Sequence, residues 1–223
     1  MTNIEFASKL MNLFPPHSIY LVGGSSRDYL LMGDFKDFDF ATSLKPVEVL
    51  VLLDVQEYDH FAFNYGTVKA KINGHDIEIT TFRKEGDYLD ARHPKKVEYV
   101  QDIEIDAKRR DFTINALYLD KDNKINDFYH GLDDLKKGII RMIGDPITRL
   151  KEDPVRILRA LRFSLTLNFK LDQDLENAIA INKDEIKKIS AFRLNSEIQK
   201  MLKIATKEAI ENIFKQHNLE IDF

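Results

Sequence analysis

The chain has 223 residues, of which 43% are hydrophobic, and a formal net charge of −4. It contains no cysteine, which excludes disulfides, zinc–thiolate sites and thiol catalysis. The longest apolar run, Val47–Leu53, is far shorter than the roughly 20 residues of a membrane span, and the amino terminus lacks the basic and apolar segments of a signal peptide. We therefore expect a cytoplasmic protein that does not associate with a membrane.

Strand and helix signals alternate through the first part of the chain. Ser18–Val22 is apolar and is followed by a Gly-Gly pair, which predicts a short strand that ends in a turn. Arg27–Leu31 has the pattern of a short helix that Gly33 ends. Pro46 stands where a helix over Val47–Leu53 should begin, because proline is favoured at the first helical position.

The next segments read as strands. Phe38–Phe40 alternates apolar and polar residues, and so do Val68–Ile72 and Ile77–Phe82. Asn73-Gly74 separates the last two, and this dipeptide favours the tight turn of a β-hairpin. Residues 84–96 are polar and contain glycine and proline, which predicts a mobile loop.

From about Leu132 the apolar spacing becomes helical. Asp153 is expected to cap a helix that has Pro154 at its first position. The expected buried stripe of that helix consists of Ile157, Leu158, Leu161 and Leu165. Further helices are predicted at Asp174–Ile181, Arg193–Ile204 and Lys207–Gln216. The pattern therefore indicates an α+β part followed by a small helical extension.

The first set of candidate functional residues lies at residues 23–28, Gly-Gly-Ser-Ser-Arg-Asp, and at Asp37 and Asp39. A glycine pair between a strand and a helix lets backbone N–H groups approach a phosphate, and Arg27 adds positive charge. Two aspartates two positions apart on a strand point to the same side. Such a carboxylate pair can hold Mg²⁺ between a triphosphate and an attacking hydroxyl.

A second set lies on the predicted helix after Asp153. Arg156, Arg159 and Arg162 recur at every third residue, so they spread over one side of the helix, opposite much of its apolar stripe. Residues 136–170 carry nine Lys or Arg against three Asp or Glu, which makes this region locally basic in a chain of net negative charge. Solvated arginines and a helix cap are the alternative interpretation of this pattern.

Four segments together carry a family resemblance. Residues 23–33 with 37–42 (GGSSRDYLLMG and DFDFAT), 109–117 (RRDFTINAL), 144–146 (GDP) and 152–163 (EDPVRILRALRF) stand in the order of that family's motifs. Over about residues 20–200 the chain resembles the class II tRNA nucleotidyltransferase and bacterial poly(A) polymerase family, within the polymerase-β-like superfamily. The resemblance implies a nucleotidyltransferase head with a mixed sheet and helices in residues 1–135, which would be catalytic. It implies an all-α neck in residues 136–223, for base selection and RNA contact.

The resemblance also implies roles for individual residues. Asp37 and Asp39 would be the catalytic Mg²⁺ ligands. Nucleotide-binding roles would fall to Gly24, Arg27, Arg110, Asp153, Arg156, Arg159 and Arg162. An Asp–Arg pair can accept from the amino group of cytosine or adenine and donate to the neighbouring ring nitrogen, whereas uracil and guanine present a carbonyl oxygen to the carboxylate. The resemblance thus implies CTP, ATP and the tRNA 3′ end as the substrates.

Three further positions leave alternatives open. Arg110 would face the nucleotide while Asp111 fixes its loop, although the two residues can also form a simple ion pair. Glu78 is a candidate third catalytic carboxylate that takes the proton of the RNA 3′-hydroxyl, or else part of a solvated strand face shared with Asp76. The dipeptide His75-Asp76 has no second His-Asp pair, and we assign it no role.

The choice within the family rests on residues 80–88 and 92–94, which resemble the mobile loop of CCA-adding enzymes. We therefore rank addition of C, C and A first, before a poly(A) polymerase or A-adding enzyme and before an RNA-binding relative without turnover. Members of the family usually continue through body and tail domains, so a chain that ends at Phe223 is expected to be a naturally minimal enzyme or a fragment.

Overall fold

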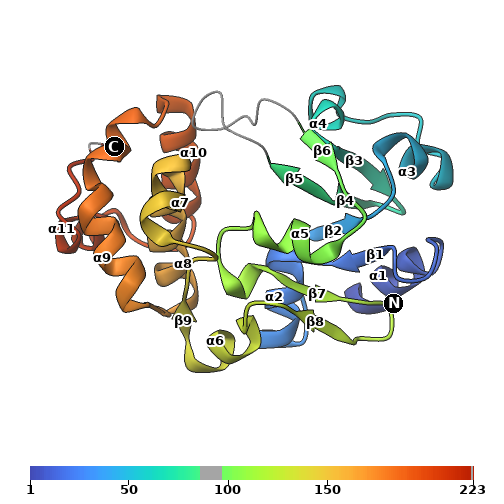
Figure 1. Ribbon diagram of the computed structural model, residues 1–223, viewed down its shortest axis with the longest axis horizontal. Coiled ribbons are helices and arrows are strands. Elements are labelled where there is room, and N and C mark those ends of the chain that lie inside the picture. The colour runs from blue at the N-terminus through green and yellow to red at the C-terminus, as the bar shows by residue number, and fades with distance from the viewer. Residues whose placement is uncertain (86–96, 222) are drawn as a thin grey trace. The chain divides into compact units, whose positions relative to one another are not determined.

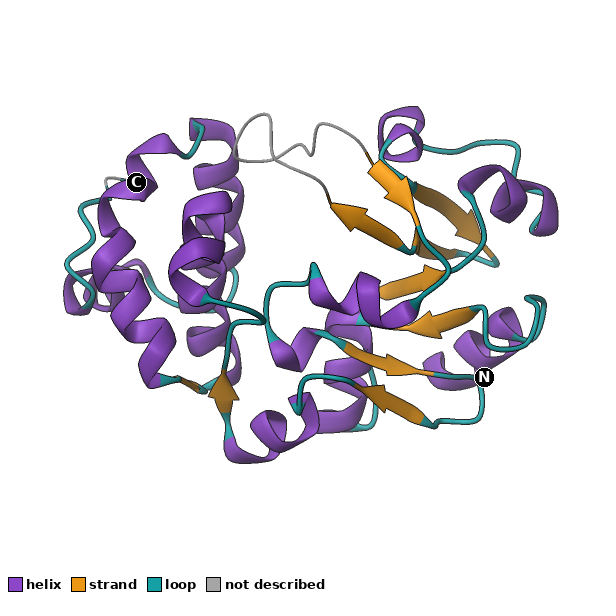
Figure 2. Cartoon of the chain, in the orientation of Figure 1, coloured by secondary structure: helices purple, strands orange, loops and turns teal. Residues whose placement is uncertain are grey.

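The computed structural model describes residues 1–85, 97–221 and 223. Contacts between Cα atoms divide the chain into two compact units, and the main boundary lies between Leu132 and Asp133. Strands and helices alternate in the first unit, whereas the second is helical apart from one short strand pair (Figure 2). The boundary predicted at residues 135–136 and the contact boundary both fall in one helix, α6 (Gly131–Lys137). No helix among the described residues is long and apolar enough to cross a membrane.

The first unit is built on a six-stranded mixed sheet (Figure 1). Its strands, in sheet order, are β3 (Thr67–Ile72), β4 (His75–Thr81), β2 (Phe38–Thr42), β1 (Ile19–Leu21), β7 (Leu117–Leu119) and β8 (Ile125–Asp127). β2 and β4 are parallel, and every other neighbouring pair is antiparallel. The sheet and its helices confirm the α+β class that the sequence predicts.

Alternation along the strands gives the sheet two different faces. One face carries Ile19, Phe38, Phe40, Ile77 and Ile79, which form the main core with the helices α1 (Asn3–Met11) and α3 (Pro46–Leu52). The opposite face carries a smaller core around Tyr20, Ala41 and Tyr118, against the helix α5 (Ile103–Lys108). The remaining elements of this unit are α2 (Gly23–Met32), α4 (His60–Asn64), β5 (Arg83–Glu85), β6 (Val97–Tyr99) and the 3₁₀ turn η1 (Thr113–Asn115).

The predicted turns and helix ends are largely confirmed. Asn73 and Gly74 have φ angles of 50° and 86°, the left-handed conformation that the β3–β4 hairpin turn requires. Gly33, with φ 75°, ends α2. α2 begins at Gly23 rather than near Arg27, so the Gly-Gly pair belongs to its first turn. Of the loop predicted over residues 84–96, Lys84 belongs to β5, and residues 86–96 lie outside the described residues.

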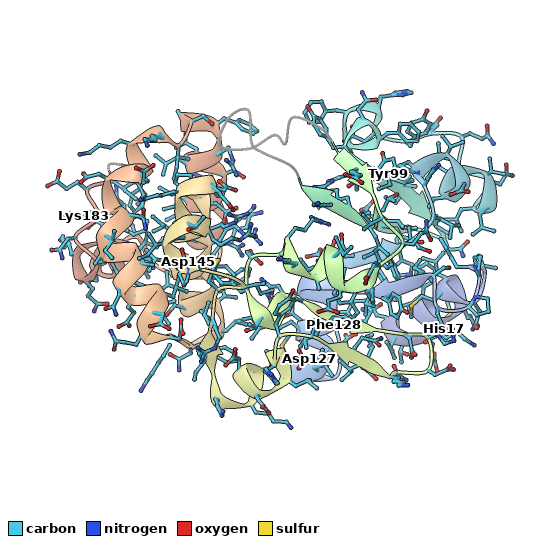
Figure 3. The ribbon with its side chains drawn as sticks, viewed as in Figure 1. His17, Tyr99, Asp127, Phe128, Asp145 and Lys183 are labelled. Carbon is cyan, nitrogen blue, oxygen red and sulfur yellow. The ribbon has the colours of Figure 1, made fainter. Side chains whose placement is uncertain are left out.

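The second unit runs from α6 onward through α7 (Pro146–Glu152), α8 (Val155–Leu167), α9 (Gln173–Asn182), η2 (Lys183–Lys188), α10 (Ala191–Leu202) and α11 (Lys207–Gln216), with the strand pair β9 (Ile139–Ile140) and β10 (Lys170–Leu171). Asp145, labelled in Figure 3, caps α7 by accepting from the Thr148 N–H at 2.8 Å. Ile157, Leu158 and Leu161 are buried, as predicted, whereas Leu165 is only partly buried.

The predicted start of α8 was wrong by one residue. The helix begins at Val155 with Pro154 as its cap residue, because Asp153 has an extended backbone that ends α7. The Asp153 carboxylate nevertheless accepts from the Val155 N–H at 3.2 Å. Asp153 therefore still lies at the start of α8, where its side chain is held by the backbone.

Candidate active site

Three carboxylates gather on the α5 face of the sheet, near the beginning of β2. In the β3–β4–β2 register, Lys69, Glu78 and Asp39 form one row across three adjacent strands. Their neighbours along the strands point into the main core, so this row lies on the opposite face. Asp37 precedes β2 by one residue, and it lines the same pocket as Asp39 and Glu78. The structure thus brings together the three carboxylates that the sequence selected.

Burial and neighbouring negative charge both act on the Asp39 carboxyl. Burial raises the pKa of the Asp39 carboxyl to about 6, and the negative charges of Glu78 and Asp37 contribute in the same direction. The Glu78 carboxylate forms an ion pair with the Lys69 ammonium, with an N–O distance of 2.8 Å. Concentrated negative charge of this kind disfavours a bare carboxylate and favours a bound cation.

The glycine turn of α2 lies directly beside these carboxylates. Gly23 has φ 68°, which only glycine adopts readily. A Cβ atom built on Gly23 would lie 3.7 Å from Asp39 Oδ2 and 4.0 Å from Arg110 Nη1. On Gly24 the corresponding atom would lie 3.6 Å from Arg27 Nη2. The small first turn of α2 therefore lies among one carboxylate and two guanidinium groups.

Hydrogen bonds hold this turn in place. The Ser25 hydroxyl donates to the Asp37 carbonyl at 2.6 Å and accepts from the Asp39 N–H at 2.9 Å. Arg27 is 6% exposed; it donates to Asn115 Oδ1 at 2.8 Å and pairs with Asp28 at 2.7 Å. The hydrogen bonds of Ser25 thereby connect the first turn of α2 directly to Asp37 and to Asp39 of β2.

Arg110 approaches the same place from the end of α5. Its Nε donates to the Tyr118 hydroxyl at 2.7 Å and its Nη2 to Asp106 Oδ2 at 3.1 Å. Asp111 accepts from the Phe112 N–H at 2.8 Å and from the Asn115 side chain at 3.1 Å, so it orders the segment after Arg110.

A pocket of about 720 Å³ opens beside the carboxylates. Its walls are formed by β2, β3, β4 and the segment before α4. The lining residues are Asp37, Phe38, Asp39, Glu57, Tyr58, Asp59, Lys69, Ala70, Lys71, Asp76, Ile77 and Glu78. Six of these residues are acidic and two are lysines, so the pocket suits a ligand that arrives with cations.

The candidate residues of the second unit lie along α8. The Asp153 carboxylate accepts from Arg193 at 2.9 Å. Arg156 is 5% exposed and donates to the Arg149 carbonyl at 2.6 Å and to Glu152 at 3.3 Å. Burial of this arginine differs from the solvated face that its spacing alone suggests, because the end of α7 packs beside it.

The two remaining arginines of α8 are also held by neighbours. The Arg162 guanidinium pairs with Glu197 at 2.7 Å, and the Arg159 guanidinium lies 5.4 Å from the centre of the Phe163 ring. α8 thus presents its arginines in defined orientations. The nucleotide-binding roles of these residues stay predictions.

Several residues that support the site were missed at the level of sequence, above all Asp106, Asn115, Tyr118, Arg193 and Glu197. Asp106 could have been found, because it lies four residues before Arg110, the spacing of an ion pair on a helix. Glu197 had no such signal, since it is 35 residues from its partner Arg162. His75, to which no role was assigned, packs against the rings of Phe6 and Phe38.

Comparisons with known proteins place this geometry in a family. The family model described as the poly(A) polymerase head domain matches residues 19–141. The chain belongs to the poly(A) polymerase head-domain family. The match covers the sheet and the segments 23–42 and 109–117, and it confirms the resemblance that the motifs indicated. A second model, described as a probable RNA- and SrmB-binding site of polymerase A, matches residues 168–215.

Relatives of this family member include CCA-adding enzymes. That of Lactobacillus helveticus is 46% identical over 182 residues, which are 82% of this chain and 45% of the relative. That of Streptococcus gordonii is 44% identical over 183 residues, 82% of this chain and 45% of the relative. The chain therefore spans about half the length of the curated relatives it matches.

Solved structures agree with the fold. The Bacillus stearothermophilus CCA-adding enzyme in complex with CTP has a TM-score of 0.84 at 31% identity, over 97% of this chain and 53% of the other. A tRNA nucleotidyltransferase with a primer tRNA and an incoming ATP analogue has a TM-score of 0.72 at 30% identity, over 96% and 60%. The polymerase-type head fold predicted from the motifs is confirmed.

Proposed function

We propose that this chain forms the catalytic part of a tRNA nucleotidyltransferase that adds C, C and A to the tRNA 3′ end from CTP and ATP and releases pyrophosphate. The proposal rests mainly on the position of Asp39 and Arg110 beside the glycine turn. A Cβ atom on Gly23 would lie 3.7 Å from Asp39 Oδ2 and 4.0 Å from Arg110 Nη1. That arrangement combines a cation site, a phosphate site and a fixed guanidinium on one face of the sheet.

Nucleotidyltransferases generally use a divalent metal ion. The donor set fits Mg²⁺, because Asp37 and Asp39 supply hard oxygen ligands, and the pKa of Asp39, which burial raises most, is raised further by the negative charges of Glu78 and Asp37. Within residues 1–85 and 97–221 no group of three or more His, Asp or Glu side chains has the spacing of a complete metal site. Mg²⁺ commonly combines one or two carboxylates with substrate phosphates. When bound, it would lower the pKa of the 3′-hydroxyl and neutralise charge on the leaving pyrophosphate.

The side chains of the head divide the remaining tasks. Backbone N–H groups near Gly24 and the guanidinium of Arg27 bind the triphosphate, and Arg110 steadies the sugar or a phosphate. The 3′-oxygen of the RNA forms a bond to the α-phosphorus while the bond to the pyrophosphate oxygen breaks. Glu78 accepts the hydroxyl proton, and Lys69 holds Glu78 beside Asp39.

Base selection is assigned to the second unit. Asp153 accepts from the exocyclic amino group of cytosine or adenine, and Arg156 donates to the adjacent ring nitrogen. Arg159 and Arg162 support this pocket, and their contacts with Phe163 and Glu197 fix their directions. Arg193 already engages the Asp153 carboxylate, so it takes part in orienting the base-reading group.

A poly(A) polymerase is the second candidate, because the family model that matches the head carries that description. The deciding experiment incubates the purified chain with Mg²⁺, CTP, ATP and a tRNA transcript that lacks its last three nucleotides. We expect products that stop at three added nucleotides and need both CTP and ATP. A long ladder with ATP alone would identify a poly(A) polymerase, and a chain that binds the transcript without extending it would be an RNA-binding relative.

A further inference from the structure

Asp106 is a buried carboxylate that none of the roles above uses. Its exposed fraction is 0%, and an isolated charge in such a place is strongly unfavourable. Four donors surround it: Arg109 Nε at 2.8 Å, Arg110 Nη2 at 3.1 Å, the Tyr118 hydroxyl at 2.6 Å and the Arg83 N–H at 3.2 Å. Although burial alone would raise the pKa of Asp106, the charges of Arg109 and Arg110 lower it to about 2. The carboxylate is therefore ionised and fully engaged at neutral pH.

Arg110 is clamped by this carboxylate and by Tyr118. The Tyr118 hydroxyl accepts from Arg110 Nε at 2.7 Å and donates to Asp106 at 2.6 Å, so the three groups form a closed set of hydrogen bonds. The guanidinium carbon also lies 5.0 Å from the centre of the Tyr118 ring. Two guanidinium nitrogens of Arg110, Nε and Nη2, thus bond to groups inside the protein. The third nitrogen, Nη1, lies 4.0 Å from the position that a Cβ on Gly23 would occupy.

We propose that Asp106 and Tyr118 are positioning residues that hold Arg110 in the orientation needed to contact the nucleotide at the Gly23 turn. The inference rests on the proposed function, since it names the side chains that prepare the nucleotide site of that reaction. A free arginine side chain samples many rotamers, and fixing its planar fork before the substrate arrives lowers the cost of binding and orientation. Asp106 acts through Arg110 and does not touch the substrate.

The test is a double-mutant cycle between Asp106→Asn and Arg110→Lys, with kcat/KM for the nucleotide as the readout. We expect Asp106→Asn to lower kcat/KM by about 10²-fold, the effect of a misplacement of about 1 Å at a reacting site. In the Arg110→Lys background the same substitution should have less than a threefold effect, because the group that Asp106 positions is already changed. Equal losses in both backgrounds would overturn the proposal.

Asp134→Asn is the matched control. Asp134 is also a buried carboxylate, 5% exposed, and it pairs with Arg141 at 3.1 Å in the second unit. We expect this variant to be less stable but to keep the kcat/KM of the parent chain below its melting temperature. A loss as large as that of Asp106→Asn would show that lost stability alone accounts for the effect.

Two further measurements keep the proposal testable. If Asp106→Asn does not fold, Tyr118→Phe takes its place in the cycle, because it removes one hydrogen bond from each partner and keeps the ring. If the parent chain shows no turnover, the proposed function fails, and the clamp is then tested by the equilibrium binding of a fluorescent ATP analogue. Asp106→Asn should weaken that binding about tenfold, and unchanged affinity would refute the clamp.

Discussion

The pocket beside Asp39 in the head and the helix α8 differ in their balance of charge. In the head, Asp37, Asp39 and Glu78 lie close together, and the pKa of Asp39 rises to about 6. On α8, Arg156 pairs with Glu152 and Arg162 pairs with Glu197, so these two arginines have protein partners of opposite sign. A cluster of carboxylates favours the binding of a cation, whereas ion pairs within the protein hold the charged side chains in fixed orientations. The first arrangement agrees with the proposed metal site, and the second agrees with the proposed recognition of the base by fixed hydrogen-bonding groups.

The largest effect is expected when a carboxylate is removed from the pocket of the head. Asp37→Ala should lower the rate of nucleotide addition by about 10³-fold or more, because a catalytic metal contributes several kcal/mol of transition-state stabilisation. Affinity for the tRNA transcript should change less than twofold. Single-turnover extension and filter binding on the same preparation measure the two quantities. A parallel loss of binding would contradict a purely catalytic role.

The next largest effect is expected when Glu197, the ion-pair partner of Arg162 on α8, loses its charge. Glu197 is 4% exposed, and, although burial acts in the opposite direction, hydrogen bonding to Lys200 and the charge of Arg162 lower its pKa. Glu197→Gln should reduce the free energy of unfolding by about 3 kcal/mol, since it leaves the Arg162 charge without its carboxylate. Urea denaturation at pH 7 measures the change. A loss below roughly 0.5 kcal/mol, the effect of an ordinary surface substitution, would show that the pair is not structurally important.

The ionisation of Asp39 should make the free energy of unfolding depend on pH. Because the folded pKa of Asp39 lies above its unfolded value, ionisation disfavours the folded state, and the penalty grows as the pH rises from about 4 through about 6. Asp39→Asn should therefore raise the free energy of unfolding by about 2 kcal/mol above pH 6 in EDTA, with no gain near pH 4. Thermal unfolding at pH 4, 6 and 8 measures the profile. Added Mg²⁺ should reverse the advantage of the variant, and a gain that is independent of pH would point to packing instead.

Loss of the Asp153 carboxylate tests recognition without the metal site. Asp153→Ala should reduce the preference for CTP and ATP over UTP and GTP by about 10- to 30-fold, equivalent to one charged hydrogen bond of about 2 kcal/mol. The maximal rate with CTP should fall by a smaller factor. Competition between nucleotides in single-addition assays measures the preference. An unchanged preference would remove Asp153 from the base-reading role.

The smallest expected effect concerns the partner of Glu78. Lys69 and Glu78 are both substantially exposed, at 48% and 41% of their side chains, so solvent screens their ion pair. Lys69→Met should change the free energy of unfolding by less than about 1 kcal/mol. The rate of addition should respond more than the stability if Lys69 holds Glu78 in its catalytic place. Lys71→Met, which disturbs the more exposed pair with Asp76, is the matched control.

Local patterns in the sequence were sufficient for much of the fold. The Asn73-Gly74 turn, the proline at the start of α3 and the helical spacing of α11 each depend on neighbouring residues only, and each was predicted with its observed position or within one residue of it. The ordered motifs around Asp37, Arg110 and Asp153 similarly indicated the family, because a motif is read along the chain.

Contacts between distant segments were decided by the tertiary structure. Glu78 could be called a strand residue from its neighbours, but only the parallel pairing of β2 and β4 places it beside Asp39. Arg193 reaches Asp153 across 40 residues, and Arg27 reaches Asn115 across 88. The sequence by itself determined which side chains are available and which face of each element they occupy, through the periods of helix and strand. Which charges meet, and therefore which are neutralised by a partner and which have their pKa shifted, depends on strand order and helix packing, which no local pattern contains.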